Sequence, residues 1–150
     1  FAPFGGRNHD GDAVRSLARL GLERGLVVHG SDGLDEITTT GATAAARIGH
    51  GRVTELTLTP EDFGIGRASP DQLRGGDRQQ NAALVRAVLA GEPGPCLEIV
   101  LVNAAAALVV AGLAPDWSAG VNLARESIHS GRAQEKLRQL IACSLAPGVA

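Results

Sequence analysis

The 150-residue sequence has no Tyr and no Met, and aromatic residues make up only 3% of it, with Trp117 as the single Trp. Hydrophobic residues nonetheless account for 44% of the chain, and a chain of this length can bury roughly two-thirds of its unfolded surface. The core must therefore consist of Ala, Val, Leu and Ile, which suits helices packed closely on a sheet. Because no initiator Met is present and the chain opens on the apolar segment FAPFGG, we expect it to be part of a longer protein.

The sequence also lacks an excess of one charge, a cysteine framework and a long apolar span. Lys and Arg total 14 against 16 Asp and Glu, a net charge of −2, which argues against nucleic acid or an anionic membrane as partner. Cys96 and Cys143 match no metal or redox spacing, so we expect buried free thiols in a cytoplasmic protein. The most apolar run, residues 97–113, contains Glu98 and Asn103 and falls short of the about 20 residues of a membrane span. It predicts a buried helix.

Hydrophobic periodicity predicts a single α/β domain, a sheet with flanking helices. Residues 12–24 carry apolar side chains at helical spacing, with Asp12 placed to cap the start of the helix and Gly25 to end it. Residues 26–29 form a short β-branched run typical of a buried parallel strand. Residues 46–60 alternate around a Gly-His-Gly turn, which predicts a hairpin. Four further helices are predicted over residues 77–89, 97–113, 117–131 and 133–144.

Three carboxylates occur in the segment that follows the predicted strand at residues 26–29. The glycines there allow a sharp loop, and Asp32, Asp35 and Glu36 lie within it. Like charges so close in sequence repel one another unless a cation lies among them or water solvates them. Ligand sites collect beyond the carboxyl ends of strands in open α/β sheets, which favours a functional role for this loop.

The residues alone leave two explanations of Asp35 and Glu36 open. Carboxylates near a helix start are stabilised by the helix dipole and the exposed backbone amides, by about 0.3–1 kcal/mol. The alternative is Mg²⁺, which keeps several waters and is held by one or two carboxylates together with substrate phosphates. Both explanations fit two adjacent acidic residues on a loop.

Two other segments are candidates for binding. The glycine amides of RGGDRQQN, residues 74–81, could face an anion. However, two glycines before Asp77 more readily turn the chain and cap the next helix. Asn103 lies in an Ala-rich run, and we expect it to be a buried hydrogen-bond donor that ties helices together.

Four blocks of the sequence, taken together, resemble the C-terminal half of the anthranilate phosphoribosyltransferases. They are VVHGSDGLDEITTTGAT at 27–43, TPEDFGI at 59–65, LRGGDRQQNAALVRAVLAGEPGP at 73–95 and LVNAAAALVVAGLA at 101–114. The blocks follow that family's order and spacing. The resemblance implies a small helical domain joined to a larger α/β domain related to pyrimidine nucleoside phosphorylases, and this chain would be the C-terminal part of the larger domain.

The resemblance also implies an activity. The family transfers the 5-phosphoribosyl group from phosphoribosyl pyrophosphate to the amine of anthranilate in tryptophan biosynthesis, as a homodimer formed largely through the helical domain. In its GLDE motif the Asp-Glu pair binds Mg²⁺ at the diphosphate donor, which assigns Asp35 and Glu36 as metal ligands here. Metal ions neutralise charge on a leaving diphosphate, so the reaction needs no protein nucleophile.

The sequence also departs from the family pattern. The family's glycine-rich GTGGD loop, its Lys-His-Gly-Asn segment and its anthranilate-contacting arginine have no counterpart here, and residues 1–11 align poorly. We therefore expect the chain alone to be inactive. Two other interpretations stay open, a non-catalytic relative that binds a phosphoribosyl ligand or nucleic acid, and an enzyme like the pyrimidine nucleoside phosphorylases. The charge balance disfavours nucleic acid, and the GLDE context disfavours a phosphorylase.

Overall fold

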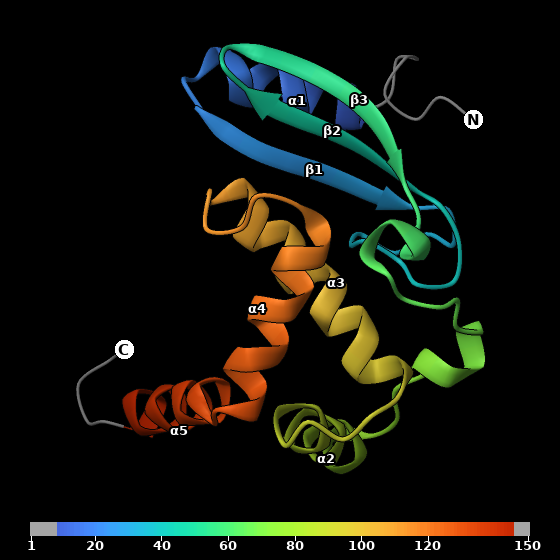
Figure 1. Cartoon of the computed structure of the whole chain (residues 1–150), viewed down its shortest axis with the longest axis vertical. Helices are drawn as coiled ribbons and strands as arrows, with labels where there is room; N and C mark the ends of the chain where they lie inside the picture. The colour runs from blue at the N-terminus through green and yellow to red at the C-terminus, as the bar shows by residue number, and fades with distance from the viewer. Residues whose placement is uncertain (1–8, 146–150) are drawn as a thin grey trace.

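The chain forms a three-stranded antiparallel sheet with helices on both of its faces (Figure 1). The computed structural model describes residues 9–145, with side chains from Val14 onward, so the FAPFGG segment lies outside the described residues. The predicted α/β class is confirmed. The elements are α1 (His9–Arg19), β1 (Arg24–Gly30), β2 (Thr43–Gly49), β3 (Arg52–Leu58), the 3₁₀ turns η1 (Pro60–Phe63) and η2 (Pro70–Leu73), α2 (Arg78–Leu89), α3 (Pro95–Val110), α4 (Trp117–His129) and α5 (Arg132–Leu145).

The predicted hairpin is confirmed as β2 and β3, whereas the predicted parallel strand is wrong. His50 and Gly51 at the hairpin turn have φ of 50° and 71°, the positive values that the tightest hairpin turns require. The strand β1 pairs antiparallel with β2, with Arg24 opposite Gly49. A parallel pair needs a crossover connection that usually contains a helix. Residues 31–42, which connect β1 to β2, contain none.

The first helix begins and ends earlier than its apolar spacing predicts. Since α1 starts at His9, Asp12 lies inside the helix and is not its cap. The helix ends at Arg19, and Gly21 follows with φ of 90°. This is the left-handed conformation that closes a helix and that Gly adopts without strain. Gly25 lies in β1 and does not end the helix.

Apolar side chains alternate between the two faces of the sheet and form two clusters. Ala44, Ala46 and Ile48 of β2 pack with Val14 of α1 on one face. Ala45 belongs to the larger cluster on the opposite face, with residues of α3 and α4. The predicted burial of the apolar helix is confirmed, and its buried residues are Leu97, Leu101, Val102, Ala105, Ala106 and Val109. Small side chains thus let the helices approach the sheet closely, as the composition predicts.

Close packing between α3 and α4 depends on Gly120. A Cβ atom at this position would lie 2.9 Å from the carbonyl oxygen of Ala105 and 3.0 Å from its Cα. The few aromatic residues reinforce the same region, where the rings of Phe63 and Trp117 lie 5.3 Å apart. The packing of α3 against α4 therefore depends on a close contact that a larger side chain at Gly120 would disrupt.

The last helix, α5, does not contribute to the buried core as α3 does. No residue of α5 is buried, and Leu140 of its predicted apolar face is 66% exposed. Cys96 is half-buried and Cys143 on α5 is exposed, so the expectation of two buried thiols is wrong for Cys143, although both thiols are free. Among residues 9–145, no helix combines the length and the apolar character needed to cross a membrane.

Candidate functional site

The acidic residues lie in the connection between β1 and β2, residues 31–42, which we call the acidic loop (Figure 1). Backbone hydrogen bonds close its base, from Gly30 N to Leu34 O at 2.8 Å and from Ser31 N to Ala42 O at 2.9 Å. No helix begins within these residues. The explanation of Asp35 and Glu36 as helix-start carboxylates is therefore wrong.

The carboxylate of Asp32 accepts hydrogen bonds from other residues of the acidic loop and so holds the loop together. Its Oδ2 accepts hydrogen bonds from the hydroxyls of Thr38 at 2.5 Å and Thr40 at 2.6 Å, and its Oδ1 accepts one from Leu34 N at 3.2 Å. Burial raises the pKa of Asp32, but the three hydrogen bonds outweigh it, so the net pKa is lowered. Gly30 leaves room for this carboxylate, since a Cβ there would lie 2.6 Å from Asp32 Oδ1. Asp32 therefore has a structural role.

Among the described residues, Asp35 has no side-chain hydrogen-bond partner, and Glu36 has only the amide of Asn103. Both are exposed, and among the side chains described from Val14 onward no Lys, Arg or His forms an ion pair with either. Partial burial and the charges of Asp35 and Asp32 raise the pKa of Glu36. No cationic side chain among those described offsets the repulsion between the two neighbouring carboxylates. A bound cation would relieve that repulsion.

Asn103 of α3 connects the helix to the acidic loop. Its Oδ1 accepts from Ile37 N at 2.9 Å, and its Nδ2 donates to Ile37 O at 2.9 Å and to Glu36 Oε2 at 3.2 Å. The expectation that Asn103 ties helices together is thus wrong, because its distant partners belong to the loop. The sequence signal for this contact was only a polar residue in an Ala-rich helix, which does not identify a partner.

The donor set of the acidic pair fits Mg²⁺. Both ligands would be carboxylate oxygens, which Mg²⁺ prefers. Among the described residues, no group of three or more His, Cys, Asp or Glu could enclose a metal ion. Two carboxylates would leave most coordination positions of a bound Mg²⁺ to water or to another ligand. Asp35 and Glu36 are the residues that would hold it.

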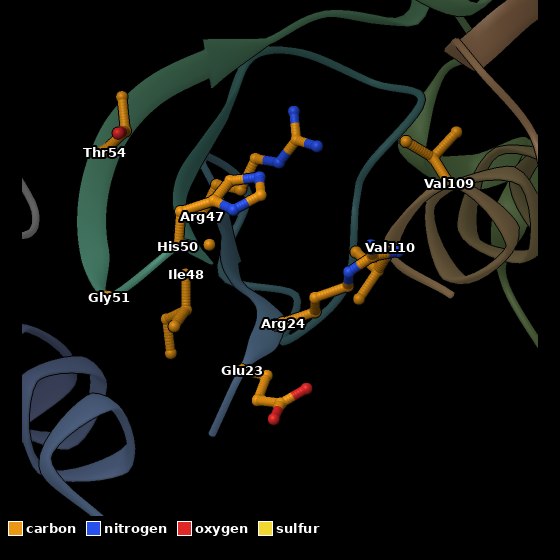
Figure 2. Close-up of a pocket in the computed structure, with 11 residues that line it drawn as sticks. Glu23, Arg24, Arg47, Ile48, His50, Gly51, Thr54, Val109 and Val110 are labelled. Atoms are coloured by element: carbon orange, nitrogen blue, oxygen red, sulfur yellow. The ribbon is translucent and has the colours of Figure 1, made fainter. Parts of the chain in front are cut away.

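Two cavities help to delimit the site. One of about 630 Å³ lies at the far end of the sheet, where Arg24, Arg47 and His50 surround it opposite the end of α3 (Figure 2). No acidic-loop residue lines it, and the length of β1 separates the two by about 20 Å. A second cavity, of about 230 Å³, lies beside the loop and is lined by apolar side chains of β1 and α3 with Ile37 and Asn103. Of these two cavities, the second lies nearer the acidic pair, because Ile37 and Asn103 contribute to its lining.

The glycine-containing segment before α2 caps that helix, as predicted. Asp77 accepts hydrogen bonds from Gln79 N at 2.8 Å and Gln80 N at 2.9 Å. The side chain of Gln80 in turn accepts from Asp77 N at 2.8 Å. The amide of Gly76 also has a partner, the Oδ1 of Asn81 at 2.8 Å, so the segment acts as the helix cap that the sequence favours.

Comparison with known proteins places the fold and the loop in a family. Residues 9–134 match the α/β domain of the glycosyl transferase family, and the chain belongs to that family. A curated relative, the anthranilate phosphoribosyltransferase of Rhodopseudomonas palustris strain TIE-1, is 54% identical over 130 residues, which are 87% of this chain and 38% of the relative. The resemblance that the sequence blocks indicate is confirmed. The chain spans about 38% of the length of such relatives.

Solved structures agree with this assignment. The anthranilate phosphoribosyltransferase of Thermus thermophilus is 40% identical with a TM-score of 0.78, covering 89% of this chain and 39% of that one. The Saccharomyces cerevisiae enzyme in complex with PRPP and Mg is 28% identical with a TM-score of 0.69, covering 75% of this chain and 33% of that one. The predicted fold is thus confirmed.

Proposed function

We propose that the chain is the diphosphate-binding portion of an anthranilate phosphoribosyltransferase, in which Asp35 and Glu36 hold Mg²⁺. The observation that carries the proposal is the exposed, uncompensated acidic pair, in a chain 54% identical to an enzyme of that name. The reaction would transfer the 5-phosphoribosyl group from phosphoribosyl pyrophosphate to the amine of anthranilate. The yeast relatives in complex with PRPP and Mg, and with 4-fluoroanthranilate, support these substrates.

The residues of the chain would contribute positioning and charge. Bound Mg²⁺ would neutralise the negative charge that develops on the departing diphosphate. The hydrogen bonds between Asp32 and the hydroxyls of Thr38 and Thr40 fix the loop, so that Asp35 and Glu36 face solvent without rearrangement. Preorganised charges of this kind stabilise a transition state without the cost of reorganisation.

The rest of the site would come from outside this chain. Because the chain covers 38% of the length of its relatives, we expect the contacts to the ribose phosphate and to anthranilate to be supplied by the remainder, and the chain alone to be inactive. We further propose a homodimeric, cytoplasmic enzyme.

The test is an activity assay on a chimaera. The chain is joined to the part of the Rhodopseudomonas palustris enzyme that precedes the matched segment, and phosphoribosylanthranilate is measured chromatographically with and without Mg²⁺. We expect Mg²⁺-dependent product, and a loss on the order of 100-fold in kcat for the Asp35→Asn, Glu36→Gln double variant. The matched control is Asp71→Asn, an exposed carboxylate in a surface ion pair. A folded chimaera without product, or one indifferent to the double variant, would refute the proposal.

A further inference from the structure

We infer that Asn103 is a positioning residue that orients the Glu36 carboxylate for cation binding. This inference rests on the proposed function of the acidic pair. Within the described residues, the Nδ2 of Asn103 is the only side-chain donor to either carboxylate of the pair, at 3.2 Å from Glu36 Oε2. The contact joins residues 67 positions apart in the sequence, so it belongs to the tertiary structure and not to the loop itself.

The amide of Asn103 also fixes the backbone next to Glu36. Its Oδ1 accepts from Ile37 N and its Nδ2 donates to Ile37 O, both at 2.9 Å. The Ile37 side chain is buried at 1% exposure, which anchors the same residue in the core. With both polar backbone groups and the side chain of Ile37 held, the peptide that carries Glu36 has little freedom to rotate.

The hydrogen-bond inventory of Nδ2 leaves Glu36 able to engage a cation. Nδ2 has two hydrogens but three acceptors, Ile37 O, Glu36 Oε2 and, at 3.0 Å, Ile99 O. The contact to Glu36 is the longest of the three. The carboxylate can therefore turn toward a cation while the two bonds between the Asn103 amide and the Ile37 backbone keep the loop in place.

Other residue types cannot reproduce this arrangement. Asp would accept from Ile37 N but has no donor for Ile37 O or Glu36, and Leu matches the shape of Asn without either function. Gln is longer by one methylene. Replacing a residue that hydrogen-bonds to a metal ligand and orients it typically lowers metal affinity by about 10–100-fold.

The chain contains a matched control for this test. Asn81 of α2 makes the same pair of contacts with one backbone residue, accepting from Gly76 N at 2.8 Å and donating to Gly76 O at 3.0 Å. It touches no residue of the acidic loop. Asn81→Ala therefore removes an equivalent pair of side-chain to backbone hydrogen bonds at a distance from the loop. Its effect on metal affinity shows what the loss of such a pair does when the acidic loop is not involved.

The experiment titrates the full 150-residue chain with Mn²⁺, and free Mn²⁺ is measured by its electron paramagnetic resonance. We expect Asn103→Ala to weaken binding about 10-fold or more, and Asn81→Ala to leave it within about twofold, with both variants folded by circular dichroism. Equal affinities for the two variants would overturn the role of Asn103 and leave the metal site intact. If the Asp35→Asn, Glu36→Gln double variant bound Mn²⁺ as well as the native chain, the metal site and the role of Asn103 would both fail.

A second measurement covers the case in which Asn103→Ala does not fold. In the native chain, Mg²⁺ is titrated while the side-chain amide signals of Asn103 and Asn81 are followed by nuclear magnetic resonance. We expect the Asn103 signals to shift with the same midpoint as the backbone amide of Glu36, and the Asn81 signals to stay fixed. Asn103 signals that do not move while those of Glu36 do would overturn the inference.

Discussion

Neutralising the three carboxylates of the acidic loop one at a time separates stability from function. Asp32→Asn removes a charged acceptor of three hydrogen bonds, at 2.5, 2.6 and 3.2 Å. Hydrogen bonds to charged groups contribute about 1.5–3 kcal/mol each. Because Asp32 is exposed and the amide keeps one acceptor, we expect a loss of about 2–3 kcal/mol in the free energy of unfolding. That is a large share of the 5–15 kcal/mol of a typical domain.

The other two substitutions should leave stability nearly unchanged. Asp35→Asn removes a charge without a partner, and Glu36→Gln keeps an acceptor for Asn103 while it relieves the repulsion that raises the Glu36 pKa. We expect changes within about 0.5 kcal/mol, as for ordinary surface substitutions. Urea unfolding followed by circular dichroism at pH 7 measures all three variants, with Asp71→Asn as a control for an exposed, ion-paired carboxylate.

The pH dependence of the free energy of unfolding tests the role of Asp32 a second time. The pKa of Asp32 is lowered in the folded chain from the ordinary 3.8, so its stabilisation is present above that value and is lost as the pH falls through the folded pKa. The difference between native and Asp32→Asn should therefore shrink as the pH falls below 3.8. The reasoning is refuted if Asp32→Asn unfolds like the native chain at pH 7, or if the Asp35 and Glu36 variants lose as much.

Two further substitutions test the packing around the site. Thr39 is fully buried, and its hydroxyl has no hydrogen-bond partner in the described part of the chain, so Thr39→Val should raise the free energy of unfolding by about 1 kcal/mol. Thr38→Val should lower it by about 2 kcal/mol, because the Thr38 hydroxyl bonds Asp32; urea unfolding giving the two changes the same sign would contradict the assignment. Gly120→Ala places a Cβ 2.9 Å from Ala105 O and should lower the melting temperature, for a net loss of about 1–2 kcal/mol. An unchanged or raised melting temperature would show that α3 and α4 separate freely.

Most local elements could be predicted from the sequence because their causes lie within a few residues. Asp77 caps α2 through bonds to residues two and three positions ahead, and a capping signal of this kind is visible in the sequence. The Gly-His-Gly turn fixes a hairpin because two neighbouring residues must take positive φ. The GLDE motif likewise indicates the acidic pair through a short, continuous pattern.

Contacts between distant residues explain what the sequence could not show. The direction of β1 depends on whether a helix lies in the connection to β2, and the apolar run of β1 is the same for either direction. The three carboxylates look alike in sequence, yet Asp32 binds threonine hydroxyls, Glu36 meets Asn103 and Asp35 stays exposed.

The sequence by itself determined the helices, the hairpin and the position of the acidic loop, since hydrophobic period, caps and turns act between near neighbours. The tertiary structure alone decided which carboxylate has a structural role and which residue donates a hydrogen bond to Glu36. A hydrogen bond that joins residues 67 positions apart has no sequence period, because it exists only after α3 packs against the sheet.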